Sequence, residues 1–307
     1  MASKLRLEDA TYGVELELGD VDTKIKIPSS LGEWDYKDGS IMNSNGTAND
    51  PKKVLNRYGS EIHVSPSKST RELTYRVMQI YELFPKKDFN FTTNLHPHIR
   101  VPGLKENLGF LKDVVRYLYM YGMELFELID PIPIPTDDSY TSEESFRGAW
   151  KRYLRRKRSH HSLLSERAVE EALKAKSPEQ FYEAHAPRSK TGRPQFHLVQ
   201  RAGVNLNQLW SNTETIEFRC FTMSPDPEKL LSAFRFTRFF LQAVEKDFPP
   251  KKFLKQFEFV FQTFWPYDYK KDKIFQLTNV RHNKREVAEA NYEKLIRKGI
   301  LTKDELQ

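Results

Sequence analysis

Short segments in which apolar residues alternate with charged ones recur along this chain, and they constrain its fold more than any other feature. The first covers residues 12–19, where apolar side chains alternate with Glu15 and Glu17. Because successive side chains of a strand point to opposite faces, this pattern predicts a strand with one apolar and one acidic face. Side chains two residues apart on a strand lie roughly 6 to 7 Å apart, so the two carboxylates repel unless a cation or an arginine lies between them. The segment is therefore either part of a metal site or the solvent-facing strand of an antiparallel sheet.

Three later segments show the same alternation and add charged or imidazole side chains to a polar face: Glu61 within residues 58–65, His96 and His98 within 91–101, and Glu217 and Arg219 within 215–221. Pro97, between the two histidines, predicts an edge strand or a local distortion because proline cannot donate to the ladder. The H-x-H spacing suits either transition-metal ligation or hydrogen bonds to a phosphate or carboxylate, and the oxygen ligands elsewhere favour the second interpretation. Cys220, on the apolar face of its segment, is predicted to be a buried core residue.

These strands would form a common sheet if their apolar faces pack against one helical layer. The opposite face would then carry the four glutamates, the two histidines and the arginine. Repulsion among the carboxylates would raise their pKa values or destabilise the fold unless divalent cations bind there. Oxygen ligands in a chain with a single cysteine suit Mg²⁺ or Mn²⁺.

Helical periodicity fills much of the chain between these strands and after them. It predicts helices at residues 70–84, 104–128, 163–176, 178–185 and 228–246. We expect one domain over residues 1–307, with a largely helical region at about 104–186 and a helical C-terminal part at about 225–307. The predicted class is α+β, with a mainly antiparallel sheet, a helical layer and a helical insertion.

The formal net charge of +7 favours an anionic partner. Much of the excess positive charge lies in a predicted helix at residues 143–158, which carries Arg155, Arg156 and Arg158. The basic side of this helix has three interpretations: an ordinary solvated face, a surface for nucleic acid or another polyanionic substrate, or a surface for an acidic protein or peptide.

The sequence contains no feature that predicts a membrane location. No apolar run approaches the roughly 20 residues that a membrane span requires. The N-terminal residues lack the apolar segment of a signal peptide. We therefore expect a cytoplasmic protein without a membrane partner.

Six motifs follow one another along the chain: G-V-E-x-E at residues 13–17, W-x-x-x-D-G-S at 34–40, G-S-E at 59–61 with S-P at 65–66, H-x-H at 96–98, R-x-x-x-N-L at 201–206 and T-I-E-F-R at 215–219. In this order they resemble the amidoligase family, which is related to glutamine synthetase and glutamate–cysteine ligase. The resemblance implies an antiparallel sheet curved around an ATP and metal site. It also implies an enzyme that joins a carboxylate to an amine at the expense of ATP.

The same resemblance implies roles for individual residues. The metal ligands that it implies are Glu15, Glu17, Glu61 and Glu217. It implies catalytic roles for Arg219, Arg201, Asp38, His96 and His98, and contacts with ATP for Arg219, Arg201 and Asn205. In this scheme Asp38 would hold the incoming ammonium group and accept its proton.

Two other classes of function fit the same pattern. One is a non-catalytic protein that keeps this fold and binds nucleic acid through the basic helix. The other is a metal-dependent hydrolase, in which the clustered carboxylates and histidines activate water. Dependence on ATP distinguishes the ligase from the hydrolase, and retention of all four acidic positions argues against the binding protein.

Overall fold

The computed structural model describes residues 5–35, 57–87, 89, 93–129, 164, 166–185, 202–249, 252 and 297. Seven strands within these residues form one sheet: β1 (Thr11–Asp22), β2 (Gly32–Trp34), β3 (Arg57–Ser67), β4 (Asn94–Arg100), β5 (Val204–Asn205), β6 (Ile216–Phe218) and β7 (Phe221–Thr222). Their order is β2-β3-β1-β4-β6-β5, and β7 also pairs with β4. All pairings are antiparallel, which confirms the predicted α+β class with an antiparallel sheet.

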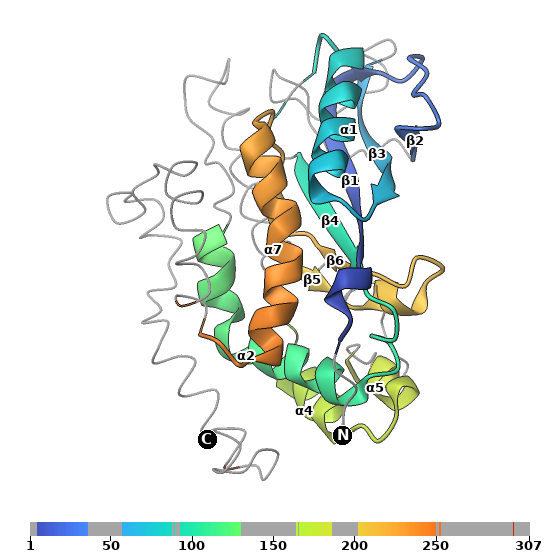
Figure 1. Ribbon diagram of the computed structural model, residues 1–307. Coiled ribbons are helices and arrows are strands. Elements are labelled where there is room, and N and C mark those ends of the chain that lie inside the picture. Colours follow the sequence, from blue (N-terminus) through green and yellow to red (C-terminus); the bar gives the residue numbers. More distant parts are fainter. Residues whose placement is uncertain are drawn as a thin grey trace, which may run out of the picture.

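The helices lie mainly on one side of this sheet. They are α1 (Thr70–Leu83), α2 (Leu108–Ile129), α4 (Glu166–Lys174), α5 (Pro178–His185) and α7 (Pro227–Glu245), with short 3₁₀ helices η1 (Leu7–Asp9) and η3 (Asn207–Trp210). Contacts join α1 to β3 and α7, and join α7 to β4. Figure 1 shows α1 and α7 side by side against the sheet, with α4 and α5 grouped near α2 at one end.

Alternation along β1 gives the sheet two unlike faces. Leu16 and Leu18 are fully buried and belong to the same apolar core as Phe236 and Phe240 of α7. Phe240 packs edge-on against Phe218 of β6, with ring centroids 5.2 Å apart. Each fully buried leucine stabilises the fold by roughly 2 to 3 kcal/mol relative to an exposed one. The apolar faces thus bind the helical layer to the sheet and leave the polar faces on the other side.

Two helices begin where polar residues cap them. The Ser69 hydroxyl accepts a hydrogen bond of 3.2 Å from the N–H of Glu72, so α1 starts at the predicted position. The Asp226 carboxylate accepts one of 2.8 Å from the N–H of Glu228 at the start of α7. Such caps satisfy backbone donors that have no partner within the helix.

Of the two alternatives predicted for Pro97, the edge strand is wrong, whereas a local distortion agrees with the structure. β4 is an inner strand, and Pro97 lies opposite Val14 of β1. On its other side, β4 pairs with β7 at Asn94 and Leu95 and with β6 only from His98 onward. Pro97 therefore occupies the gap between two partner strands, where the missing N–H interrupts no described pairing on that side.

Other predictions differ from the structure in their boundaries. The single strand predicted at residues 215–221 is divided into β6 and β7, which pair with different parts of β4. The predicted helices near 163–176 and 178–185 are present as α4 and α5, and Cys220 is buried as expected. Among the described residues, no helix has both the length and the apolar character needed to cross a membrane.

Candidate metal site

The pairing register of β1 brings acidic and imidazole side chains onto one face of the sheet. Glu15 lies opposite His63 of β3 on one side and opposite His96 of β4 on the other. Glu17 lies opposite Glu61 of β3. Directly opposite residues on paired strands point to the same face. The predicted acidic face therefore exists across β3, β1 and β4.

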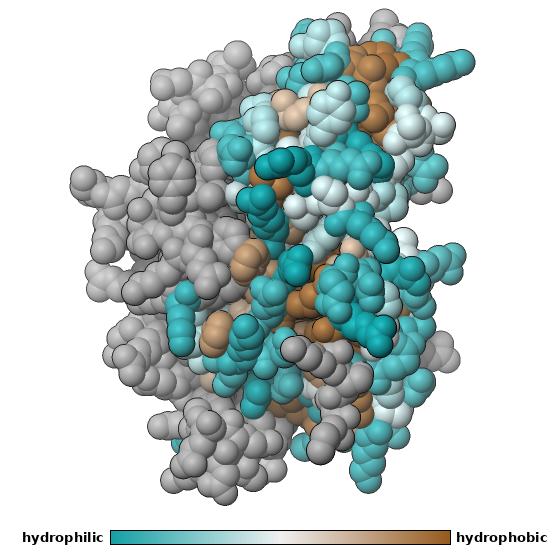
Figure 2. Space-filling view, viewed as in Figure 1, coloured by the Kyte–Doolittle hydropathy of each residue, from teal (hydrophilic) through white to brown (hydrophobic). Residues whose placement is uncertain are grey.

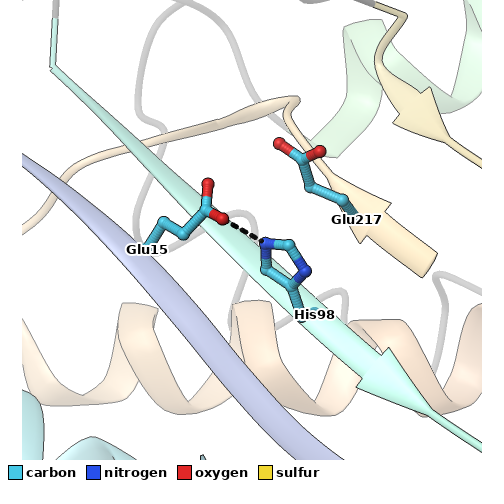
Figure 3. Close-up of side chains that lie close together, drawn as sticks. All are labelled: Glu15, His98 and Glu217. Carbon is cyan, nitrogen blue, oxygen red and sulfur yellow. Dashed lines mark ion pairs between the residues drawn. The ribbon is translucent and has the colours of Figure 1, made fainter. Parts of the chain in front are cut away.

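The strands on the other side of β4 extend this face. Glu217 of β6 lies opposite His98 of β4 and opposite Asn205 of β5. Figure 3 shows Glu15, His98 and Glu217 rising from three neighbouring strands on the same side of the sheet. The sequence segments that contribute them are separated by many residues, so only the sheet brings them together.

Within this face, potential ligand atoms fall into two groups that share Glu15. Glu15, His98 and Glu217 form the first, and Glu15, Glu61 and His96 form the second. In each group, one nitrogen or oxygen from each residue lies within 4.8 Å of the others. Carboxylate oxygens with imidazole nitrogens suit Mn²⁺ and, where oxygen predominates, Mg²⁺. The donor set therefore fits a divalent cation.

His98 is oriented as a metal-ligating histidine commonly is. Its Nδ1 forms a hydrogen bond of 2.9 Å with the Thr215 hydroxyl, which directs Nε2 toward the acidic face. Nε2 lies 3.2 Å from a carboxylate oxygen of Glu15, yet it is buried and has no hydrogen bond within the described part of the chain. An imidazole whose second nitrogen is held in this way has a fixed ring orientation. The buried Nε2 is the observation that best supports a bound ligand.

Glu15 lies among imidazoles that stabilise its charge. His63 and His96 each place a ring nitrogen 3.3 Å from one of its oxygens. Burial raises the pKa of Glu15, but the three surrounding imidazoles outweigh burial and hold the pKa below its ordinary value. Burial also raises the pKa of Glu61, and the charges of Glu15 and Glu17 add to that effect, while His96 opposes it. The environment thus favours the ionised form of Glu15, whereas it disfavours the ionised form of Glu61.

His96 has no exposed side-chain surface and faces most of the cluster. Burial and the nearby Arg219 lower its pKa, but the carboxylates of Glu17, Glu15 and Glu61 outweigh both and raise it to about 9. Its Nδ1 lies 3.6 Å from Glu217 and 3.7 Å from Glu61. A metal bound by His96 would therefore have to displace a proton from the ring.

Glu217 forms hydrogen bonds with two residues for which the family resemblance implies contacts with ATP. Asn205 donates a hydrogen bond of 2.6 Å to one of its oxygens, and Arg219 donates to the other. Burial lowers the pKa of Arg219, but the adjacent Glu217 and Glu17 raise it overall. The Nε of Arg219 is buried and makes no hydrogen bond among the described residues. Both residues therefore position Glu217, and Arg219 keeps a donor for another group.

Glu17 differs from the other predicted ligands. It is buried, and one of its oxygens accepts a hydrogen bond of 2.8 Å from the N–H of Asn94. Its other oxygen lies 3.6 Å from Nε2 of His96, and it belongs to neither group of converging ligand atoms. Glu17 therefore supports His96, while Glu15, Glu61 and Glu217 converge as predicted.

Two residues join the site without having been predicted as members of it. His63 lies 3.2 Å from the Asp35 carboxylate, and its hydrogen bond with Glu15 raises its pKa to about 8 despite partial burial. The alternation in residues 58–65 predicts His63 on the same polar face as Glu61, and the structure confirms that position, although no role in the site was predicted for it. Asp35 follows the short strand β2, and nothing in its sequence context distinguishes it from a turn residue.

Asp38, Arg201 and the basic helix at 143–158 lie outside the described residues, as does the predicted C-terminal helical part after residue 249, apart from residues 252 and 297. The described fold and face define an α+β protein with a candidate metal site on an antiparallel sheet. In comparisons with known proteins, the chain matches no family model, no curated protein and no solved structure. The chemistry of the site is therefore the evidence for its function.

Proposed function

We propose that this protein is an ATP-dependent carboxylate–amine ligase with a sheet of the glutamine synthetase type. The observation that carries the proposal is the convergence of Glu15, Glu61 and Glu217 with His96 and His98 on one sheet face. The order of motifs along the chain supports the same class of enzyme. The cofactor would be Mg²⁺ or Mn²⁺, and the substrates a carboxylate, an amine and ATP.

The reaction needs no protein nucleophile. The substrate carboxylate attacks the γ-phosphorus of ATP, forming an acyl phosphate and releasing ADP. The amine then attacks the acyl carbon, so that the amide forms, phosphate leaves and the nitrogen loses a proton. A divalent cation, if held by Glu15, Glu61 and Glu217 of the acidic face, would stabilise the phosphate charge. Most catalysis of phosphoryl transfer comes from such stabilisation and from positioning.

Particular side chains would serve this sequence of steps. Arg219, whose Nε has no described hydrogen bond, would donate to the transferring phosphoryl group, and Arg201 would assist it. Asn205 would keep Glu217 in place through its hydrogen bond of 2.6 Å. Asp38 would hold the ammonium group and accept its proton. The basic helix at 143–158 would guide a polyanionic substrate if the carboxylate or amine belongs to one.

The decisive experiment measures release of ADP and phosphate from Mg²⁺-ATP in mixtures of carboxylates, amino acids, polyamines and nucleic acids. We expect metal-dependent release that rises with one carboxylate and one amine, together with an amide product. The double variant Glu15→Gln, Glu217→Gln should lose the activity, because it removes a ligand charge from both groups. Glu82→Gln, on the exposed side of α1, is the matched control and should retain it. Wild-type turnover in the double variant would refute the proposal.

A second candidate is metal-dependent hydrolysis. Two imidazoles contribute to the ligand groups, and nitrogen ligands are common where a transition metal activates water. Hydrolysis would require metal but not ATP. Turnover of an ester, amide or phosphate in ATP-free buffer, lost in the same double variant, would favour this candidate over the ligase.

A further inference from the structure

A second polar site lies on the helical side of the sheet, away from the carboxylates. A cavity of about 510 Å³ opens where the start of α1 meets α7, and its lining includes Lys68, Arg235 and Arg238. Tyr12 of β1 also lines the cavity. Because Tyr12 and Glu15 are an odd number of residues apart on one strand, they belong to opposite faces. We propose that this cavity binds a small anion that carries two or more phosphate groups.

The sequence explains why the three cations meet. Arg235 and Arg238 are three residues apart on α7, so their side chains lie on the same side of the helix. Lys68 immediately precedes the residue that caps α1, and α1 packs against α7. All three side chains are exposed. Figure 2 shows strongly hydrophilic side chains gathered over the region where α1 and α7 lie together.

No acidic residue in the described part of the chain forms an ion pair with these cations, Lys68, Arg235 and Arg238. The nearby acidic residue of α1, Glu72, is engaged with Arg76 at 2.6 Å and with the Ser67 hydroxyl. Like charges around one cavity repel one another unless an anion lies between them. The positive end of the α1 dipole adds to the same field.

The volume and the lining residues of the cavity suit a compound with several phosphate groups. The cavity volume lies within the range of small-molecule sites. Arginine binds phosphate through two parallel hydrogen bonds, so two arginines and a lysine suit an anion with several phosphate oxygens. Gln242 adds an amide, and Phe239 adds an apolar surface beside Tyr12. A diphosphate or triphosphate group satisfies these features better than a single carboxylate.

The test is calorimetric titration of the full chain with inorganic pyrophosphate and tripolyphosphate in buffer containing EDTA. EDTA prevents the carboxylate face from binding phosphate through a metal, so this site is tested independently of the proposed ligase. We expect saturable binding of one anion per chain. In Arg235→Gln, Arg238→Gln the dissociation constant should rise about a hundredfold, because each arginine contributes a charged hydrogen-bond partner. Lys24→Gln, Lys26→Gln removes the same charge from exposed positions outside the cavity and should leave the constant within about twofold.

The outcomes are distinct. Absence of saturable binding to wild type, or an equal loss in both double variants, would overturn the proposal. If the arginine variant does not fold, the single variant Lys68→Gln takes its place, with an expected rise of about tenfold. ATP in the same buffer identifies the source of the phosphates: affinity equal to tripolyphosphate supports recognition of the phosphates alone, and tighter binding supports a nucleotide stacked near Phe239. Binding of a DNA duplex but of neither phosphate would show the proposal to be wrong.

Discussion

At the scale of single residues, the site is defined by how each ligand is held. His98 is the clearest example, because the Thr215 hydroxyl fixes one ring nitrogen and leaves the other facing Glu15. Thr215 is itself buried and follows Glu214, a residue with positive φ. The loop before β6 therefore supplies the hydrogen bond that orients His98 on the neighbouring strand β4. Such outer contacts often matter to a metal site nearly as much as the ligands.

Replacing Thr215 with valine tests this arrangement. Thr215→Val removes the hydrogen bond to His98 with little change of shape, so the ring is free to turn. We expect the dissociation constant for Mn²⁺ to rise by about 10- to 100-fold. Titration of metal-free protein with Mn²⁺ measures it. Thr215→Ser keeps the hydroxyl and should bind nearly as wild type; equal weakening of both variants would contradict the role given to Thr215.

The histidines also predict how stability depends on pH in metal-free protein. His63 and His96 have pKa values raised to about 8 and about 9, above the value of about 6.5 for an unfolded histidine. Their protonated forms therefore stabilise the fold fully below about pH 6.5, and this contribution disappears as pH rises through about 8 and 9. The melting temperature in EDTA should fall over that interval. The melting temperature of the His63→Gln variant should fall less between pH 6.5 and 8. If its melting temperature falls as steeply with pH as that of wild type, His63 does not contribute.

At the scale of elements, alternation predicted which side chains share a face, but not which strands are neighbours. Glu15, His96 and Glu217 were assigned correctly to polar faces because a strand has a period of two residues. Their distances depend on register, which is set by tertiary packing. Pro97 shows what alternation cannot predict. An inner strand accommodates this proline because the partner of β4 changes there from β7 to β6. Asp35 lies next to His63 because β2 pairs with β3, so its sequence context alone did not identify it.

The start of α7 offers a prediction at this scale. Asp226 accepts a hydrogen bond from the N–H of Glu228, and α7 carries many of the aromatic side chains of the core. Asp226→Ala should lower the free energy of unfolding by about 1 kcal/mol, because a backbone donor loses its cap. Urea unfolding measures the change. Asparagine caps equally well, so the free energy of unfolding of Asp226→Asn should differ from that of wild type by only a few tenths of a kcal/mol. A similar loss of stability in both variants would point to the charge of Asp226 rather than to its cap.

At the scale of the whole molecule, the sheet separates two kinds of chemistry. Its polar face gathers acidic and imidazole side chains, while the helical layer on the other face carries Lys68, Arg235 and Arg238 around the cavity between α1 and α7. An acidic cluster of this kind contributes little stability by itself, because burial and mutual repulsion oppose ionisation. Glu61 shows this directly, since burial and its acidic neighbours raise its pKa. The fold therefore tolerates an unfavourable charge that the proposed cation would relieve.

Glu61→Gln separates the stability of the fold from that of the site. The amide removes an unfavourable charge, so metal-free protein at pH 7 should melt at a higher temperature than wild type. The variant also loses a ligand of the second group, so Mn²⁺ should stabilise it less. For wild type, Mn²⁺ at a hundred times its dissociation constant should add about 2.7 kcal/mol. Thermal melting with and without Mn²⁺ measures both effects, and Glu82→Gln should behave as wild type in each. If Glu61→Gln destabilises the metal-free protein and leaves the gain from Mn²⁺ intact, then Glu61 is a structural partner of His96 rather than a ligand.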